Sequence, residues 1–321
     1  MVASCGSVFA PAIRPDVVSR PVKTDSSLLP LHLLDRTRDL ELIARIIARG
    51  FVSGLHRAPF NGSGLDFAGH RPYQQGDELR RVDWRLFGRT DRHYIREYRE
   101  DANLRAWIVV DATASMGYAE ESGVSKLRYA VVLAAVLAHI MLGSGDAVGL
   151  ASYGERVRLE VVPRSRRGHL HDLFLALQRV RAGGRSSASL ALDRVANSTQ
   201  RRGRVILISD LLERDDGNAL ISAASRLRAR DDEVIVLRVL TPAEAGLRPA
   251  AAAEWYDPES PYPGVPAAIE GGGEFPARVD AYYRTLSERL RSQGIEYVGL
   301  STAEPVEKAL RRWIAARRAP A

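Results

Sequence analysis

Short apolar stretches alternate with longer helical patterns from residue 101 to the C-terminus, and this alternation most constrains the fold. Predicted strands span residues 105–110, 147–152, 156–162, 204–209, 233–240 and 295–300. Predicted helices span residues 125–142, 168–181, 188–199, 218–230, 278–293 and 305–316. Strands that alternate with helices pack into a mainly parallel sheet, which the helices cover on both faces.

One connection in this series is too short for a crossover helix. The strands at 147–152 and 156–162 are joined by the tight return around Tyr153-Gly154-Glu155, so they should pair antiparallel. We therefore predict an α/β protein with a doubly wound, mainly parallel sheet and one antiparallel edge strand. A small N-terminal helix and a β-arm region precede it.

The domain organisation follows from changes in pattern. Residues 1–34 contain four prolines and no sustained period, which predicts an irregular leader. Residues 35–101 form a separate N-terminal region. The α/β domain spans 102–318 and carries an insertion at 241–277, which is rich in Pro and Gly and which we expect to be a mobile flap.

Within the N-terminal region, two elements are predicted. Residues 35–49 have apolar side chains at helical spacing, and Gly50 and Gly54 should end this helix. Residues 93–98 alternate as in a strand or one arm of a hairpin.

The formal net charge of +7 raises the question of nucleic-acid binding. Basic residues are spread along the chain, and the densest stretch, 71–101, also carries many acidic residues that can pair with them. Binding to nucleic acid requires an exposed surface of one charge sign. We therefore predict no nucleic-acid partner.

The cysteine content and the apolar runs bear on location. Cys5 is the single cysteine, which excludes an intrachain disulfide and suits a reducing compartment. The longest apolar run, 129–142, is shorter than the roughly 20 residues that cross a bilayer. The features of a signal peptide do not precede Cys5. We expect a cytoplasmic protein without a membrane span.

Oxygen-bearing side chains directly follow two predicted strands. Asp111, Thr113 and Ser115 follow the strand at 105–110, and Asp210 follows the strand at 204–209. Ligands of open α/β sheets bind at the carboxyl ends of the strands, so the two carboxylates should face one another there. Close carboxylates repel unless they are protonated or bridged by a cation. Such oxygen ligands suit Mg²⁺, Mn²⁺ or Ca²⁺ better than Zn²⁺.

A third loop, residues 183–187, precedes a predicted helix and can supply another hydroxyl group. Ser186, Ser187 and Ser189 are all candidates. These loops also have an ordinary interpretation, because Asp, Ser and Thr after a strand commonly cap the next helix. The residues alone leave metal binding and helix capping both open.

Two patterns resemble a known family. Asp111-x-Thr113-x-Ser115, the hydroxyl loop at 184–187 and Asp210 together resemble the metal-ion-dependent adhesion site of von Willebrand factor A domains. The stretch GHRPYQQGDELRRVDWR at 69–85, followed by IREY at 95–98, resembles the signature of the bacterial domain of unknown function 58. The resemblance extends from Leu34 to the last helix and leaves the leader unmatched.

The resemblance implies a von Willebrand factor A-like, Rossmann-like domain and a set of metal ligands. These are Asp111, Thr113, Ser115, Ser186 and Asp210. The implied cation is Mg²⁺, with Mn²⁺ or Ca²⁺ as alternatives. Ser186 stands where the family usually has Thr, and it lacks the methyl group that restricts the side-chain rotamer, so we expect weaker metal binding. A partner's Asp or Glu would complete the coordination.

The resemblance also implies a function without catalysis. It indicates a protein-interaction module that works with a MoxR-type AAA+ ATPase, or with its client, in chaperone-like assembly or maturation. One alternative is a structural scaffold with a vacant metal site. Another is a metal-dependent hydrolase, which is disfavoured because the loops contain no His or Glu that could serve as a base, apart from Glu213 just beyond Asp210.

The family-like stretch at 71–98 has two interpretations. We predict that its members form a buried clasp of ion pairs and aromatic contacts, which fixes the β-arm to the α/β domain. The residues of this predicted clasp are Asp77, Asp83, Trp84, Arg85 and Arg89. The alternative is a surface on which a partner docks.

Overall fold

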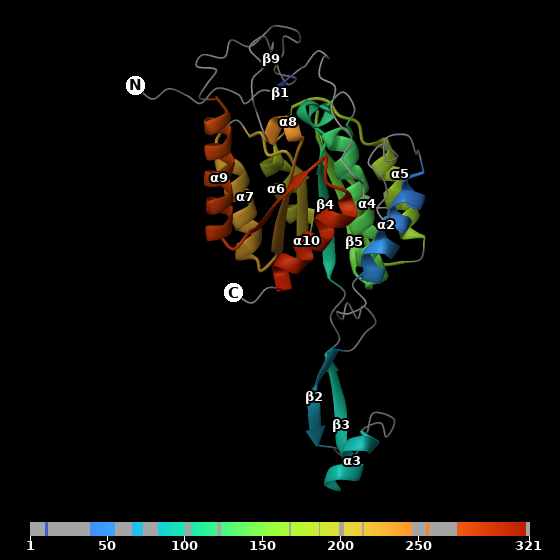
Figure 1. Ribbon diagram of the computed structural model, residues 1–321. Helices are drawn as coiled ribbons and strands as arrows, with labels where there is room; N and C mark the ends of the chain where they lie inside the picture. The colour runs from blue at the N-terminus through green and yellow to red at the C-terminus, as the bar shows by residue number, and fades with distance from the viewer. Residues whose placement is uncertain are drawn as a thin grey trace.

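A sheet of six strands forms the centre of the molecule, in the order β10-β8-β7-β4-β5-β6 (Figure 1). The computed structural model describes residues 10–11, 39–54, 66–72, 83–99, 104–120, 123–166, 168–185, 187–198, 202–213, 215–245, 255–256 and 275–318. The strands are β4 Arg105–Asp111, β5 Ala147–Tyr153, β6 Val157–Arg164, β7 Gly203–Ser209, β8 Glu233–Leu240 and β10 Glu296–Ser301. Only β5 and β6 pair antiparallel in this sheet. The predicted α/β class, with one antiparallel edge strand, is confirmed.

The order of the strands reverses beside β4. Strands β5 and β6 follow on one side of β4, whereas β7, β8 and β10 lie on its other side. The carboxyl ends of β4 and β7 therefore form the switch point, which is where open α/β sheets bind ligands. Asp111 ends β4 and Ser209 ends β7, so both residues lie at this switch point.

Helices cover both faces of the sheet. Helices α2, α4, α5 and α10 pack on one face, against side chains such as Ile108 and Val110. Helices α6, α7 and α9 pack on the other face, against side chains such as Trp107 and Val109. Successive β4 residues pack on opposite faces of the sheet because side chains alternate along a strand. The helices are α2 Leu40–Gly54, α4 Lys126–Gly143, α5 His169–Arg179, α6 Ala188–Ser198, α7 Asn218–Ala229, α9 Phe275–Ser292 and α10 Val306–Arg318.

Helix α4 is the most apolar helix of the domain. Ser125 caps it, since its hydroxyl oxygen accepts a hydrogen bond from Arg128 N at 3.1 Å. Among the described residues, Lys126–Gly143 is the one helix with the length and composition to cross a membrane, and 67% of it is buried inside the protein. The apolar run at 129–142, which alone is too short to span a membrane, thus belongs to a longer helix that packs in the core.

Helix α2 differs from its prediction at both ends. It begins at Leu40 instead of residue 35 and continues through Gly50 to Gly54. Arg311 Nη2 donates a hydrogen bond to Gly50 O at 2.6 Å, and a Cβ atom at Gly50 would lie 3.1 Å from the carboxylate of Glu307. Gly50 therefore permits close packing of α10 on α2 and does not end the helix.

Short parts of the leader and the insertion pair with one another. Strand β1, Ala10–Pro11, is antiparallel to strand β9, Trp255–Tyr256. The short helix α8, Pro242–Ala245, follows β8 directly, where the insertion was predicted to begin. The other residues of the leader, and the predicted flap at 246–254 and 257–274, lie outside the described residues.

A hairpin precedes the sheet, as the sequence predicted. Strand β2, Asp66–Pro72, pairs antiparallel with β3, Tyr94–Arg99. Helix α3, Trp84–Thr90, lies at the end of the hairpin that is farther from the α/β domain (Figure 1). We call β2, α3 and β3 the arm.

The side chains of the arm correct one prediction. Trp84 is 57% exposed, and its ring contacts Phe87 and His93 edge-on, with centroid distances of 6.0 and 6.3 Å. Asp83 caps α3, because its carboxylate accepts a hydrogen bond from Leu86 N at 3.1 Å. Trp84 therefore packs within the arm and does not clasp the arm to the α/β domain. Asp77 lies outside the described residues.

Candidate metal centre

The Asp111 loop leaves the sheet at the switch point. Asp111 is the last residue of β4 and is only 3% exposed. Thr113 and Ser115 follow, at the start of the short 3-10 helix η2, Ala114–Gly117, and are also buried. Thr113 makes no side-chain cap to this helix, and Ser125 is the residue that caps α4. The helix-capping interpretation therefore does not account for Thr113.

Both oxygens of the Asp111 carboxylate accept hydrogen bonds. Oδ1 accepts from the backbone N and the Oγ1 of Thr113, at 2.9 and 2.7 Å. Oδ2 accepts from Tyr153 OH at 2.9 Å and from Ser209 Oγ at 2.5 Å. Four donors from three elements thus fix a carboxylate that burial has removed from water.

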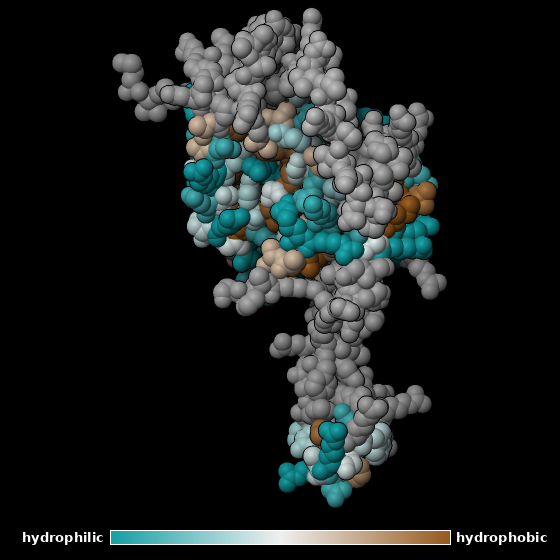
Figure 2. Space-filling view, in the orientation of Figure 1, coloured by the Kyte–Doolittle hydropathy of each residue, from teal (hydrophilic) through white to brown (hydrophobic). Residues whose placement is uncertain are grey.

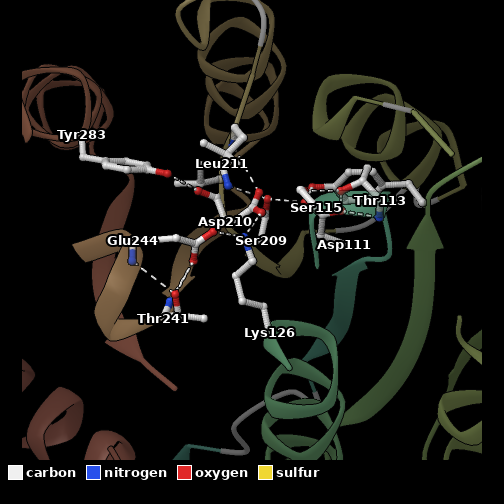
Figure 3. A network of polar contacts seen from close by, with 12 residues as sticks. Asp111, Thr113, Ser115, Lys126, Ser209, Asp210, Leu211, Thr241, Glu244 and Tyr283 are labelled. Atoms are coloured by element: carbon white, nitrogen blue, oxygen red, sulfur yellow. Dashed lines mark hydrogen bonds and ion pairs between the residues drawn. The ribbon is translucent and has the colours of Figure 1, made fainter. Parts of the chain in front are cut away.

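The oxygens of the loop converge on one point (Figure 3). Thr113 Oγ1 lies 3.1 Å from Ser115 Oγ and 2.7 Å from Asp111 Oδ1. An octahedral Mg²⁺ ion with bonds of about 2.1 Å places neighbouring ligand oxygens about 3 Å apart. The same spacing is normal for hydrogen-bonded oxygens. The hydrogen bonds within the loop therefore already hold its oxygens at the distances that neighbouring metal ligands require.

The electrostatics of Asp111 favour either a proton or a cation. Burial raises the pKa of Asp111 from 3.8 to about 7, and the negative charge of Asp210 adds to the rise. Hydrogen bonds from Ser209 and Thr113 partly oppose it. A divalent cation would stabilise the ionised carboxylate by the same Coulomb interaction. Proton and metal would thus compete for this group.

Asp210 pairs with a buried ammonium group (Figure 3). Lys126 Nζ lies 2.7 Å from Asp210 Oδ2 and 2.6 Å from Glu244 Oε1. Burial alone would lower the pKa of Lys126, but the two carboxylates outweigh it and raise that pKa above its usual value. Lys126 is therefore charged, and it compensates Asp210 from the side of α4.

Further hydrogen bonds connect this pair to α8 and α9. Glu244 Oε2 accepts from Thr241 N at 2.9 Å and from Thr241 Oγ1 at 3.0 Å. Tyr283 OH, from α9, donates to the carbonyl oxygen of Asp210 at 3.0 Å. Helices α4, α8 and α9 thus meet at the end of β7, next to the Asp111 loop.

The second predicted loop packs against the first through its backbone. Ala114 N donates to Gly184 O at 3.1 Å, and Gly183 N donates to Ala112 O at 2.9 Å. Gly154 lies between these loops, where a Cβ atom would come within 2.6 Å of both Ala112 O and Gly183 O. The absence of a side chain at Gly154 therefore allows the two loops to meet.

Of the three candidate serines of the second loop, the structure describes Ser187 and Ser189. Ser186 lies outside the described residues, so its role as a ligand stays a prediction. Ser187 and Ser189 contact one another, with their Oγ atoms 2.9 Å apart.

Glu213 lies next to the start of α6. Its Oε1 accepts a hydrogen bond from Ala188 N at 3.1 Å. Burial raises the pKa of Glu213 from 4.5 to about 7, and the charges of Asp111 and Asp210 contribute. The one acid that the sequence offered as a base is thus held by the backbone of α6.

Four residues of this network are not among the predicted site residues: Tyr153, Ser209, Lys126 and Glu244. Tyr153 and Ser209 had a usable signal, since each ends a strand that neighbours β4. Lys126 also had one, because it is one of two cationic residues, with Arg128, at the start of a mostly apolar helix. Glu244 had none, because its partner Lys126 is 118 residues away along the chain.

The donor set fits a hard cation in part. Asp111, Thr113 and Ser115 offer one carboxylate and two hydroxyl groups, which suit Mg²⁺ or Mn²⁺. Among the described residues, no three His, Cys, Asp or Glu side chains gather to hold a metal ion. A cation here would therefore depend on the hydroxyl oxygens of Thr113 and Ser115.

Comparison with known families identifies the chain. Residues 69–262 match the family described as "Protein of unknown function DUF58", which covers more than half of the sequence. The chain belongs to this family. One relative, the uncharacterized protein Rv1480 of Mycobacterium tuberculosis, is 27% identical over 314 residues, which are 95% of this chain and 96% of that protein. Mb1516 of Mycobacterium bovis matches with the same values.

Solved structures similar to this DUF58 chain include several von Willebrand factor A-like proteins. BatB from Bacteroides thetaiotaomicron has a TM-score of 0.45 and 15% identity, over 66% of this chain and 98% of its own. The SpRpn10 VWA domain has a TM-score of 0.39 and 12% identity, over 65% of this chain and 95% of its own.

The predicted cytoplasmic location is corrected by this comparison. The similar structures also include an aerotolerance-related membrane protein from Bacteroides fragilis, with a TM-score of 0.40 and 16% identity, over 66% of this chain and 99% of its own. That name describes the Bacteroides protein, and a cytoplasmic location is no longer proposed for this chain. The prediction rested on a short apolar run and a missing signal peptide, and neither excludes a place at a membrane.

Proposed function

We propose that residues 102–318 form a protein-interaction module in which the Asp111 loop binds a divalent cation, with Mg²⁺ as the first choice. The observation that carries this proposal is the convergence of oxygens from Asp111, Thr113 and Ser115 at the switch point. Ser186 and Asp210 complete the proposed set. The cation would supply positive charge that attracts an acidic side chain of a partner protein.

The site favours binding over catalysis. A metal-dependent hydrolase needs a base that reaches the attacking water. Glu213 is the candidate, and its Oε1 already accepts a hydrogen bond from Ala188 N. The polar groups around Asp111 and Asp210 are likewise engaged with one another.

The partner in this proposal is a MoxR-type AAA+ ATPase or its client, and the work is chaperone-like assembly or maturation. The resemblance of Asp111-x-Thr113-x-Ser115 to an adhesion site and the family match at 69–262 support it. The partner's Asp or Glu would occupy the open position of the cation.

One observation favours a second candidate function. Lys126 already gives Asp210 a positive charge at 2.7 Å, so the pair is compensated without a metal. In that case the same residues form a structural scaffold whose metal site stays vacant, and the partner binds the loops directly.

A metal titration separates the two candidates. The melting temperature is measured in EDTA and at rising concentrations of Mg²⁺, Mn²⁺ or Ca²⁺. A cation that binds only the folded protein must raise the melting temperature. Thr113→Val keeps the shape of the side chain but removes its hydroxyl group, so it should abolish the rise, whereas Thr113→Ser should preserve it. If millimolar metal does not raise the melting temperature of the wild-type protein, the metal-binding proposal is wrong and the structural scaffold is favoured.

A binding experiment tests the partner. The purified chain is immobilised and the ATPase is captured in the presence of Mg²⁺ or EDTA. Capture should require Mg²⁺ and should be lost in Asp111→Asn. Asp193→Asn is the matched control, because Asp193 lies in α6 and pairs with Arg226 on the surface. Equal capture by the wild type and Asp111→Asn would contradict the proposed role of the site.

A further inference from the structure

The arm ends in a cluster of aromatic side chains that is partly exposed. A two-stranded hairpin is at best marginally stable in water unless it packs on something else. Here α3 adds a cluster of Trp84, Phe87 and His93, yet Trp84 remains 57% exposed. Exposed Trp side chains with neighbouring Arg are typical of the residues that dominate binding energy in protein interfaces. Arg89 and Arg92 are close to the cluster in sequence and are exposed.

An apolar cavity of about 410 Å³ opens near the amino ends of the parallel strands, whereas the Asp111 loop lies at their carboxyl ends. It lies between α2, α4 and α10, and its walls include Phe51, Leu137, Ile140 and Trp313. The volume lies in the range of ligand-binding pockets. Figure 2 shows hydrophobic residues at this lower end of the domain, on the side from which the arm extends.

The mouth of the cavity is polar. Asp146, Arg204 and Arg317 line it together with Ser144. Arg204 and Arg317 both pair with Glu233, which holds them at the rim. An apolar interior with a rim of both charge signs suits an aromatic side chain whose own neighbours are charged.

The geometry of the arm decides which copy can reach the cavity. Pro72 pairs with Tyr94 near α3, whereas Asp66 pairs with Arg99 near the domain. Six residues of β3 therefore place the aromatic cluster about 20 Å from the base of the hairpin. Figure 1 shows the arm extending away from its own sheet, so its tip points away from its own cavity.

We propose that the tip of the arm docks in this cavity of a second copy of the chain, with Trp84 as the inserted side chain. Two copies that exchange their arms form a symmetric dimer with two identical contacts, which is the commonest form of closed assembly. Each contact buries an exposed Trp and fills an apolar cavity. This assembly uses neither the Asp111 loop nor its cation, so it is independent of the proposed function.

Cross-linking between two different variants tests the proposal. Both carry Cys5→Ser, which removes the single natural cysteine. The first carries Gly88→Cys: Gly88 lies one helical turn after Trp84, and a side chain there meets no atom within 4 Å. The second carries Ser144→Cys, an exposed, nearly isosteric change at the mouth of the cavity. A short bismaleimide is added to each variant and to their mixture.

The mixture should yield a cross-linked dimer that neither variant yields alone. Trp84→Ala in the first variant should lower the yield about tenfold or more, because such aromatic anchors carry most of an interface's affinity. The matched control is Leu190→Ala, since Leu190 is also an exposed apolar side chain, at 59%, but lies on α6.

Three results would overturn the proposal. One is a mixture that forms no dimer, which leaves the cavity to a different ligand. Another is a cross-link within a single chain that carries Gly88→Cys together with Ser144→Cys, which identifies the chain's own arm as the occupant. The third is a dimer yield that Trp84→Ala does not change.

Discussion

Lys126 and Asp210 form a fully buried ion pair, with Nζ 2.7 Å from Oδ2, in the middle of the candidate metal centre. Glu244 shares the same ammonium group at 2.6 Å. One cation therefore serves two carboxylates, and a third, Asp111, lies close enough for the charge of Asp210 to raise its pKa. The centre has more negative than positive charge, which is the electrostatic condition for binding a further cation.

Loss of the ammonium group should strongly destabilise the protein. Lys126→Met keeps the length of the side chain but leaves Asp210 and Glu244 without their cation. Breaking a buried pair costs about 3–5 kcal/mol, because an uncompensated charge remains inside. Urea unfolding in EDTA measures the change in free energy of unfolding.

The matched control for Lys126 is an exposed pair of similar length. Arg226 Nη2 lies 2.6 Å from Asp193 Oδ1 on the surface. Arg226→Met should cost about 1 kcal/mol or less, because water screens exposed pairs. If Lys126→Met cost no more than Arg226→Met, the buried pair would not stabilise the fold.

Gly154 should be required for the contact between the two loops of the site. In Gly154→Ala, the new Cβ atom would meet Ala112 O and Gly183 O at 2.6 Å, which is too close for either carbonyl to stay in place. We expect a loss of about 1–3 kcal/mol of stability, typical of overpacking, and weaker metal binding. Thermal unfolding with and without Mg²⁺ measures both effects.

Gly183→Ala is the control in the same loop. A Cβ atom at Gly183 meets nothing within 4 Å, so this variant should behave like the wild type. Equal effects of the two substitutions would show that the loop tolerates no change at all, and would contradict the specific role of Gly154.

Most of the fold could be predicted because its signals are local. The strand Glu233–Leu240 was predicted residue for residue, since a mostly apolar run is typical of burial on both faces of a parallel sheet. The end of α2 was misplaced because Gly50 is a helix breaker in isolation but a packing residue against α10.

The candidate site could be predicted where its residues share one loop or directly follow a predicted strand, as Asp210 does. Asp111, Thr113 and Ser115 lie within five residues, so their shared loop is visible in the sequence. The pairing of Lys126 with Asp210 spans 84 residues and depends on how α4 packs on the sheet. No local pattern specifies such a contact. The expectation that Asp111 and Asp210 repel unless they are protonated or bridged by a cation did not identify Lys126 as a cation beside Asp210.

The stability of the metal-free protein should fall as the pH rises towards 7. The pKa of Glu213 is raised from 4.5 to about 7, so the folded protein binds this proton more tightly than the unfolded chain does. Its contribution is complete below about pH 4.5 and is lost as the pH rises through 7. Glu213→Gln removes this titration and should reduce the slope of unfolding free energy against pH. Asp111 retains a slope of the same sign, so an unchanged slope in Glu213→Gln would contradict the prediction.

Metal binding should have the opposite dependence on pH. Burial and the charge of Asp210 raise the pKa of Asp111 to about 7, and a ligand carboxylate must lose its proton before it binds a cation. Below pH 7, each further unit should therefore weaken the apparent affinity for Mg²⁺ by about tenfold. Isothermal titration at pH 6 and pH 8 measures this, with Asp111→Asn as the control, which should bind poorly at both. An affinity that is equal at the two pH values would mean that Asp111 does not bind the cation.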